Sequence, residues 1–359
     1  MIRFGINSNE PLWLTCGARG SQFFGVAILA FGLAFCTTTA LGQSGTRFPT
    51  RNQPSTGAVR RASASTDVRS NGELSLANLR IPREEIRSGG PPKDGIPAIT
   101  NPNVISAREA TSLTRESRIV GLTLNGESRA WPVSILTQHE IVNDTLDGVP
   151  IAVTYCPLCD SAVVFDRRKA DGRSVYEFGV SGLLYNSNVL LYDRGSRQQS
   201  LWSQLGSYAV SGPASGTRLR SLPAELTTAQ DWLARFPKST VMSDKTGYRR
   251  DYRRNPYASY FRSDRLMFPV QPTSRSLPNK ERVLGLVAGE HTAAIPWSSI
   301  ARLPEEIEVA IGNKKARLAV DRRNNSIRVL SADEGIESTY SLWFAWHAFH
   351  PATTLLKPR

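Results

Sequence analysis

Residues 151–165 read IAVTYCPLCDSAVVF, and this stretch indicates the fold more clearly than any other part of the chain. Ile151 to Tyr155 is an apolar, β-branched run that predicts a buried strand. It leads directly into Cys156-Pro157-Leu158-Cys159, and the run from Ala162 to Phe165 predicts a second strand. Because only a short turn separates them, we predict an antiparallel pair with both cysteines at its tip.

Short strand-like runs and dense turn signals continue along the chain. Arg118 to Leu124 is one such run, and Asn125-Gly126 after it is typical of a hairpin turn. Helices are few: Pro132 begins a helical pattern that extends through Val142, and a second pattern covers Thr227 to Phe236. We therefore predict an α+β fold that is mainly antiparallel β with a few helices.

One segment of the chain resembles another. Residues 118–136 (RIVGLTLNGESRAWPVSIL) align without gaps to residues 282–300 (RVLGLVAGEHTAAIPWSSI), and six positions are identical. Both segments read strand, turn, strand, proline and helix. We interpret them as an internal duplication of a strand-turn-strand-helix unit, with coincidence of a common pattern as the alternative.

The first 42 residues have the three-part layout of a secretory signal peptide. A weakly positive start precedes the apolar run 23–36 (FFGVAILAFGLAFC), and residues 40–42 (ALG) place small side chains where a signal peptidase cleaves. An uncleaved anchor in the inner membrane over residues 23–41 is the alternative. Both interpretations predict an exported protein of the periplasm or cell envelope.

A flexible, basic linker is predicted over residues 43–92, because small and polar residues dominate it. The chain carries 44 Lys and Arg against 31 Asp and Glu, a formal charge of +13. An anionic envelope surface is therefore a reasonable partner. Nucleic acid is not expected, since the charge is not concentrated on one predicted element. Residues 93–357 are predicted to form a single globular domain with two pseudo-repeated lobes.

Cysteine usage restricts the chemistry. Of four cysteines, Cys16 and Cys36 lie in the leader, which leaves Cys156 and Cys159 as one pair in the body and excludes a disulfide-rich scaffold. The pair could close a local disulfide, act as a redox dithiol or supply two thiolates to a metal. A CPxC turn between strands is typical of a metal-binding knuckle, and Asp160 stands where such a turn requires a left-handed residue.

A tetrahedral metal site needs further ligands. His139, at the end of the helix before the cysteine strand, is the nearest candidate, and bonding to a backbone carbonyl is its alternative role. His350 shares a helical face with His347, although an aromatic-rich helix of this kind more often packs against the core. Glu140 is a candidate acid or base near the pair, with a solvated helix-end carboxylate as the alternative.

A polar cluster follows further along the chain. Tyr185, Asn186 and Asn188 flank Ser187 and could line a cleft, or form a structured turn because Asn and Ser readily bond their own backbone. Serine hydrolase chemistry is not indicated, since the pattern at residues 179–183 lacks the closing glycine of a nucleophile elbow. The sequence also contains no phosphate loop and no dinucleotide fingerprint.

Several of these stretches together resemble a bacterial and archaeal family catalogued as domain of unknown function 3179. They are DGIPAITNP at 94–102, HEIVND at 139–144, TYCPLCDSAV at 154–163, FGVSGLLYNSN at 178–188, YDR at 192–194, LWSQ at 201–204 and residues 343–353. In this family glycine commonly follows the second cysteine, so Asp160 is a departure that bears on loop conformation and metal preference. The resemblance implies one unit over about residues 93–356 and implies no activity.

We therefore expect an exported protein that binds copper or zinc through Cys156, Cys159 and His139, since thiolate and imidazole suit these metals. Two alternatives stay open. One is a thiol–disulfide oxidoreductase that uses the same pair, and the other is a non-catalytic envelope module in which the pair forms a local disulfide. Additional candidate residues are Asp160, Glu140, His350, Tyr185, Asn186 and Asn188.

Overall fold

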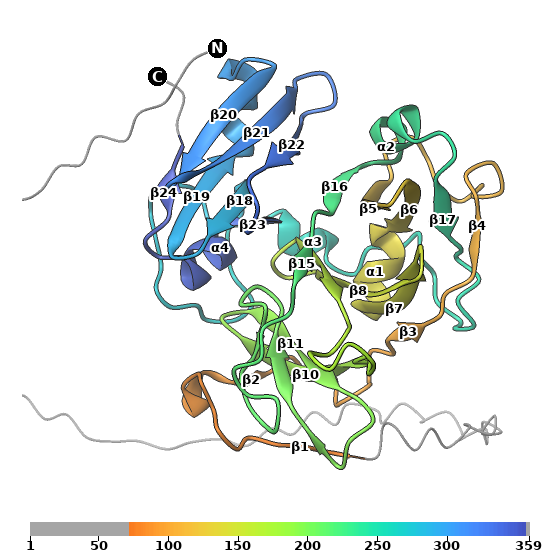
Figure 1. Ribbon diagram of the computed structural model, residues 1–359, viewed down its shortest axis with the longest axis vertical. Coiled ribbons are helices and arrows are strands. Elements are labelled where there is room, and N and C mark those ends of the chain that lie inside the picture. The colour runs from red at the N-terminus through yellow and green to blue at the C-terminus, as the bar shows by residue number, and fades with distance from the viewer. Residues whose placement is uncertain (1–71, 357–359) are drawn as a thin grey trace, which may run out of the picture. The chain divides into compact units, whose positions relative to one another are not determined.

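The computed structural model describes residues 72–356, and strands dominate this part of the chain (Figure 1). The predicted α+β class is therefore wrong, because the protein is mostly β, whereas the predicted predominance of strands over a few helices agrees with the structure. Its helices are short: α1 (Val133–His139), α2 (Ala229–Arg235), α3 (Ala258–Phe261), α4 (Trp343–Phe349) and the 3₁₀ helices η2 (Arg83–Glu85) and η3 (Trp297–Arg302). The helix predicted through Val142 ends at His139, since Glu140 has a positive φ of 59° and a strand begins at Ile141.

The largest sheet contains the strands that flank the cysteines. Its order is β24 (Thr354–Leu355), β19 (His291–Pro296), β18 (Arg282–Ala288), β23 (Ile336–Leu342), β9 (Ser161–Asp166), β8 (Val149–Cys156), β7 (Ile141–Leu146) and β3 (Ile99–Thr100), with β15 (Ser221–Leu222) paired to β9. Most neighbours are antiparallel, whereas β24 on β19 and β3 on β7 are parallel. The contact between β23 and β9 joins distant parts of the chain, with Tyr340 opposite Ala162.

β8 and β9 form the antiparallel pair predicted from residues 151–165. Their register places Thr154 opposite Val163 and Cys156 opposite Ser161, so residues 157–160 make the turn. Most side chains of both strands are buried. This explains the continuous apolar run, because a strand covered on both faces needs no alternation with polar residues.

The two segments compared as a repeat have the same strand pairing. The first belongs to a sheet ordered β16 (Glu225–Thr228), β5 (Arg118–Leu124), β6 (Glu127–Pro132), β17 (Thr240–Met242) and β4 (Val104–Ser106). Here β5 lies between β16 and β6, as β18 lies between β23 and β19 in the largest sheet. The parallel strands β17 and β24 then pair with β6 and β19 respectively.

The likeness extends to single residues. Gly121 on β5 faces Trp232 of α2, and Gly285 on β18 faces Trp346 of α4; a methyl group on either glycine would overlap the indole ring. Both indoles are buried, so each helix packs on its sheet by placing a ring over bare backbone. The duplication itself is unconfirmed, and the segments differ in the helix after the hairpin, which is α1 in one and the 3₁₀ helix η3 in the other.

A third sheet carries the polar cluster predicted at residues 185–188. Its order is β14 (Tyr208–Ala209), β13 (Leu201–Ser203), β11 (Asn188–Asp193), β10 (Phe178–Tyr185) and β2 (Arg87–Ser88). β10 and β11 form a hairpin with Asn186 and Ser187 as its turn. The other strands are β20 (Glu306–Ile311), β21 (Lys314–Asp321) and β22 (Ser326–Ala332) in an antiparallel sheet, and β1 (Glu73–Leu74) paired in parallel with β12 (Gln198–Gln199).

Part of the predicted linker is ordered. β1, η2 and β2 all precede residue 93, and Leu74 and Ile81 pack in a cluster with Tyr192 and Leu201. The boundary predicted at residue 92 therefore lies too late, because apolar side chains within residues 74–86 provide a buried face that the average composition conceals. The predicted leader and the linker up to residue 71 lie outside the described residues. Among the described residues, no helix is long and apolar enough to cross a membrane.

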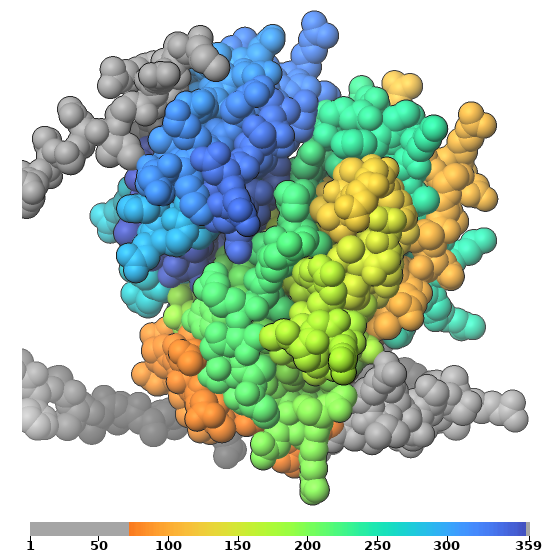
Figure 2. Space-filling view, in the orientation of Figure 1, coloured from red at the N-terminus to blue at the C-terminus, as the bar shows by residue number. Residues whose placement is uncertain are grey.

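Two apolar cores position the cysteine turn. The larger core combines residues of both repeat-like sheets, including Leu122, Trp131 and Leu284. The second core contains both cysteines and packs them with residues such as Phe178 and Trp202. In the space-filling view the C-terminal residues (blue) contact the green middle of the chain (Figure 2).

Candidate functional site

The cysteine turn presents both thiols to the interior. Cys156 and Cys159 are free thiols with no exposed surface. The Cys159 N–H donates to the Cys156 carbonyl at 3.2 Å, and Asp160 has a φ of 47°. The left-handed residue predicted after the second cysteine is therefore confirmed, since the short polar side chain of Asp tolerates this region better than most.

Both sulfurs face the turn of the β10–β11 hairpin. The Ser187 carbonyl accepts from Cys159 Sγ at 3.3 Å and from Cys156 Sγ at 3.7 Å. Asn188 Nδ2 donates to Cys159 Sγ at 3.7 Å. Asn186 and Ser187 both have positive φ, of 50° and 60°, which turns the Ser187 carbonyl toward the sulfurs. The sulfurs thus have polar contacts from a second, distant hairpin.

The two thiols differ in acidity. Burial alone would raise the pKa of Cys156, but the Cys159 thiol and the backbone N–H groups of Cys159, Val189 and Leu158 outweigh it and lower that pKa. Burial and the neighbouring Cys156 raise the pKa of Cys159 well above its usual range. Cys156 therefore ionises first, and its thiolate accepts a hydrogen bond from the Cys159 thiol.

Buried amides and hydroxyls fix the partners of the sulfurs. Gln204 Oε1 accepts from Asn188 Nδ2 and from Ser161 Oγ, each at 2.8 Å. Gln204 Nε2 donates to Thr154 Oγ1 at 3.1 Å. All four residues are almost completely buried. Because each amide group has a defined partner, the network orients Asn188 toward Cys159.

Glu140 is a buried acid near the turn, as predicted, and the alternative of a solvated carboxylate does not hold because it is only 6% exposed. Burial first, and the charge of Cys156 second, raise the pKa of Glu140 to about 8. Its carboxyl group is therefore protonated at neutral pH. The backbone has φ 59° and ψ −32°, a sparsely populated conformation for a residue with a side chain. The Tyr155 N–H donates to the Glu140 carbonyl at 2.8 Å and stabilises this bend.

Asp160 is held by one arginine from each repeat-like segment. Arg118 Nη1 donates to Asp160 Oδ1 at 2.8 Å, and Arg282 Nε donates to Oδ2 at 2.9 Å. The Tyr155 hydroxyl also donates to Oδ1, at 2.7 Å. Burial alone would raise the pKa of Asp160, but the two guanidinium groups outweigh it and lower that pKa. The side chain next to Cys159 is thus an ionised structural anchor for the cysteine turn.

The segment around α3 covers the turn from outside. The Tyr260 hydroxyl donates to the Leu158 carbonyl at 3.1 Å, and Ser187 Oγ donates to the Phe268 carbonyl at 2.9 Å. Burial is the main cause that raises the pKa of Tyr260, with the two cysteines contributing second. Residues 257–271 therefore pack against the core that contains the cysteines, and no sequence pattern indicated this cover.

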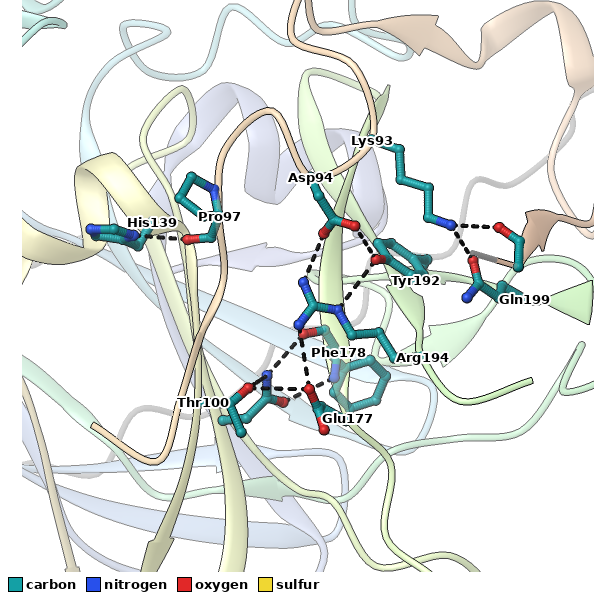
Figure 3. Close-up of polar contacts among 12 residues, drawn as sticks. Lys93, Asp94, Pro97, Thr100, His139, Glu177, Phe178, Tyr192, Arg194 and Gln199 are labelled. Atoms are coloured by element: carbon teal, nitrogen blue, oxygen red, sulfur yellow. Dashed lines mark hydrogen bonds and ion pairs between the residues drawn. The ribbon is translucent and has the colours of Figure 1, made fainter. Parts of the chain in front are cut away.

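His139 does not join the cysteines. Its Nδ1 bonds the Pro97 carbonyl at 2.8 Å, as Figure 3 shows, and its Nε2 bonds the Tyr252 hydroxyl at 2.7 Å. Burial lowers the pKa of His139. Each ring nitrogen offers a single bonding direction, so neither is available to a metal at the sulfurs. The prediction of His139 as third ligand is wrong in this structure, and its alternative role, a bond to a backbone carbonyl, is the one observed.

The loop bonded by His139 is anchored by the cluster that Figure 3 draws. Arg194 Nη2 donates to Asp94 Oδ1 at 2.8 Å, and the Tyr192 hydroxyl donates to Asp94 Oδ2. Arg194 Nη1 also contacts Glu177 Oε1 at 3.3 Å. Every group in this cluster bonds another group of the protein. The DGIPAI and YDR motifs therefore fix a loop beneath α1.

The remaining candidate residues lie apart from the sulfurs or have structural roles. His350 packs against Trp346 in a tilted arrangement with ring centroids 4.1 Å apart, and burial lowers its pKa to about 4. Tyr185 contacts Phe349 edge to face, and Asn186 Oδ1 accepts from the Gln271 N–H at 2.9 Å. The structured-turn interpretation of this cluster thus fits Asn186, whereas Asn188 does reach the cysteines.

The structure brings together Cys156, Cys159 and Asn188, and Glu140 lies close enough for the charge of Cys156 to affect its pKa. Within residues 72–356, no three His, Cys, Asp or Glu side chains form a group that could hold a metal ion. The residues that sequence reasoning missed had signals: Gln204 ends the LWSQ motif, and the pair Arg118 and Arg282 is the first identity in the repeat alignment. The Ser187 carbonyl had none, because a backbone group leaves no mark in the sequence.

These features define the class as a mostly β protein with a buried dithiol turn. Residues 93–339 match a family described as protein of unknown function (DUF3179), and this match covers more than half of the chain. The chain belongs to this family, and the resemblance drawn from its motifs is confirmed. No curated protein and no solved structure matches the chain.

Proposed function

We propose that the protein binds one monovalent copper ion through Cys156 and Cys159. The observation that carries this proposal is the arrangement of the pair, two free thiols in one turn that are both fully buried and both face the Ser187 carbonyl. Thiolates are soft ligands that favour Cu(I), and two of them complete a coordination that this ion accepts. Cu(I) would bind between the two sulfurs and displace their thiol protons to solvent.

Charge supports monovalent copper over zinc. Two thiolates with Cu(I) carry one net negative charge, the same charge that the pair carries once Cys156 alone has ionised. Backbone N–H groups of Leu158, Cys159 and Val189 stabilise this charge at Cys156. Zinc requires four ligands in a structural site, and the described residues do not supply two more beside the sulfurs.

A thiol–disulfide exchange function is less well supported by the geometry. Such a centre needs a sulfur that a partner can reach, with the thiolate stabilised at a helix N-terminus. Here both sulfurs are fully buried, and the turn connects two strands rather than a strand and a helix. A bound ion is compatible with this burial once residues 257–271 have moved to admit it.

The test is an anaerobic titration with Cu(I) in competition with a chromophoric Cu(I) chelator. The full chain is used with Cys16→Ser and Cys36→Ser, so that only the body thiols bind. We expect one equivalent of copper, with an affinity at least about tenfold to a hundredfold lower after Cys156→Ser or Cys159→Ser, since loss of a mere supporting group already costs that much. Equal binding by the cysteine variants would remove the proposal.

His139→Gln is the matched control for the ligand set. We expect it to keep the copper affinity within about twofold, because both ring nitrogens bond elsewhere. Circular dichroism checks that this variant is folded. A folded His139→Gln protein that loses copper would contradict a site built on two thiolates.

We also propose that the protein is exported to the periplasm or cell envelope. The apolar run 23–36 and the small residues 40–42 support this proposal. A fusion of residues 1–71 to a reporter enzyme that is active only outside the cytoplasm tests it, and an inactive reporter of normal abundance would count against export. Membrane fractionation of the same fusion separates a cleaved signal peptide from a retained anchor.

A further inference from the structure

A cleft of about 400 Å³ opens on the outer side of the cysteine turn. Pro157 of the turn lines it, together with the start of β5, the start of β18, one side of α1 and residues 252–261. We call it the arginine cleft, after four of its lining residues, Arg118, Arg253, Arg254 and Arg282. Its volume lies within the range of small-molecule sites.

The lining is positively charged. Arg118 and Arg282 share the single carboxylate of Asp160, so this trio keeps a surplus of one positive charge. Arg254 has no ion pair among the described residues, and Arg253 meets Asp251 at 3.4 Å with its side chain 94% exposed. No Asp or Glu lines the cleft. A cleft with several arginines and no lining carboxylate attracts anions.

The surrounding chain strengthens this potential. Residues 245–280 contain nine Lys and Arg against two Asp, a surplus of seven within 36 residues. The body's positive charge is therefore concentrated on one segment, which differs from the dispersed charge expected from the sequence. This segment supplies one wall of the arginine cleft and also covers the sulfurs.

The cleft has uncharged walls as well. Tyr252, Tyr257 and Phe261 offer aromatic surface, and Ser134 and Thr137 on α1 offer hydroxyl groups. Guanidinium groups bind carboxylate and phosphate oxygens in a planar, two-pronged geometry. Aromatic side chains pack against a ring or other apolar body. The lining thus suits a molecule that has both parts.

We propose that the arginine cleft binds a small organic oxyanion, a ring or apolar body that carries a carboxylate or phosphate group. This site is separate from the copper site, because its ligand contacts the outer side of the cysteine turn while the sulfurs point to the interior. The proposal does not rest on the proposed function. Copper binding and oxyanion binding are measured separately, and either one can fail alone.

Isothermal titration with benzoate, phenyl phosphate and neutral benzyl alcohol tests the site. We expect benzoate or phenyl phosphate to bind and benzyl alcohol to bind at least about tenfold more weakly, the loss expected for one charge-assisted hydrogen bond. The stronger of the two anions identifies the group as carboxylate or phosphate. Absence of binding by both anions at millimolar concentration, or equal binding of the alcohol, would overturn the proposal.

Arg254→Gln and Arg265→Gln form the matched pair of variants. Both side chains are exposed and belong to the same basic segment, but only Arg254 lines the cleft. We expect Arg254→Gln to weaken the anion at least about fivefold and Arg265→Gln to change it less than about twofold. Equal weakening in both would show a diffuse charge effect rather than a site. Unchanged thermal unfolding shows that neither variant has lost its fold.

Discussion

Arg118 and Arg282 begin equivalent strands of two similarly paired hairpins, and they bind opposite oxygens of the same buried carboxylate. Arg118 donates to Asp160 Oδ1 at 2.8 Å and Arg282 donates to Oδ2 at 2.9 Å. Asp160 directly follows Cys159, so the residue that joins the two hairpins also ends the cysteine turn. The stability of the fold and the shape of the dithiol site therefore depend on one side chain.

Removal of this charge should be costly. Asp160→Asn keeps a side chain that tolerates the left-handed backbone but leaves two guanidinium groups facing each other without a carboxylate. We expect the free energy of unfolding to fall by about 3–5 kcal/mol, as when one partner of a buried ion pair is removed. Urea unfolding followed by tryptophan fluorescence measures the change.

The control for this variant is Glu306→Gln, which breaks the ion pair with Arg317. The side chains of Glu306 and Arg317 are 62% and 53% exposed respectively. We therefore expect this variant to lower the free energy of unfolding by less than about 1 kcal/mol. If Asp160→Asn cost no more than this exposed pair, the two arginines would not hold the turn.

The glycine under each indole should resist substitution. In Gly121→Ala and Gly285→Ala the added methyl group would overlap the ring of Trp232 or Trp346. We expect each change to lower the free energy of unfolding by about 2–3 kcal/mol, since the buried ring must shift. Gly126→Ala is the comparison, because open space surrounds the position of the added methyl group. Only the positive φ of Gly126 opposes the change, and we expect it to lower the free energy of unfolding by about 1 kcal/mol. Equal costs at all three positions would contradict this packing.

Glu140 should make the protein less stable as the pH rises. The folded pKa of about 8 lies above the ordinary value of 4.5, so the unfolded chain loses the proton first. The contribution of Glu140 to the free energy of unfolding should therefore be highest below pH 4.5. It should fall as the pH rises from 4.5 to about 8.

Glu140→Gln removes this dependence. We expect the variant to be more stable than the natural protein by about 2–3 kcal/mol at pH 7, with equal stability near pH 4. Glu334→Gln, at an exposed carboxylate, serves as the control and should leave the slope against pH unchanged. Thermal unfolding between pH 4 and 8 measures all three proteins. A Glu140→Gln protein with the original slope would show that Glu140 is ionised in the fold.

The cysteine thiols should react slowly although the pKa of Cys156 is lowered. Both sulfurs lie beneath residues 257–271 with no exposed surface. In the chain with Cys16→Ser and Cys36→Ser, we expect alkylation by iodoacetamide to be at least about a hundredfold slower than in urea, because it must await local opening. Mass spectrometry counts the modified thiols. Fast alkylation of the native protein would favour a redox role instead.

The sequence predicted the cysteine hairpin well and its surroundings poorly. The apolar runs around Cys156 and Cys159 are local signals, and so is the left-handed position of Asp160. His139 was assigned to the metal because it is near in sequence, but its ring nitrogens bond groups from two other segments. The early end of α1 depends on the strained backbone of Glu140, which is stabilised by a bond from β8 and leaves no local pattern.

The organisation of the chain shows the same limit. The predominance of strands and the small number of helices are predicted from the sequence, but the α+β class is not, because the two helical patterns form helices of only seven residues each. The ordered part of the linker depends on β12 and the β10–β11 hairpin, whose paired residues lie 95 to 125 positions further along the chain. Contacts over such separations are absent from composition and periodicity.

X-ray absorption at the copper edge tests most directly the claim that Cys156 and Cys159 alone bind Cu(I). The sample is the full chain with Cys16→Ser and Cys36→Ser, to which one equivalent of Cu(I) has been added. The two-thiolate site predicts a spectrum described by two sulfur neighbours, with no signature of an imidazole ring, and the same spectrum in His139→Gln. Loss of the sulfur neighbours in Cys156→Ser with Cys159→Ser completes the prediction. A spectrum that requires imidazole, or that is unchanged without the two cysteines, would contradict it.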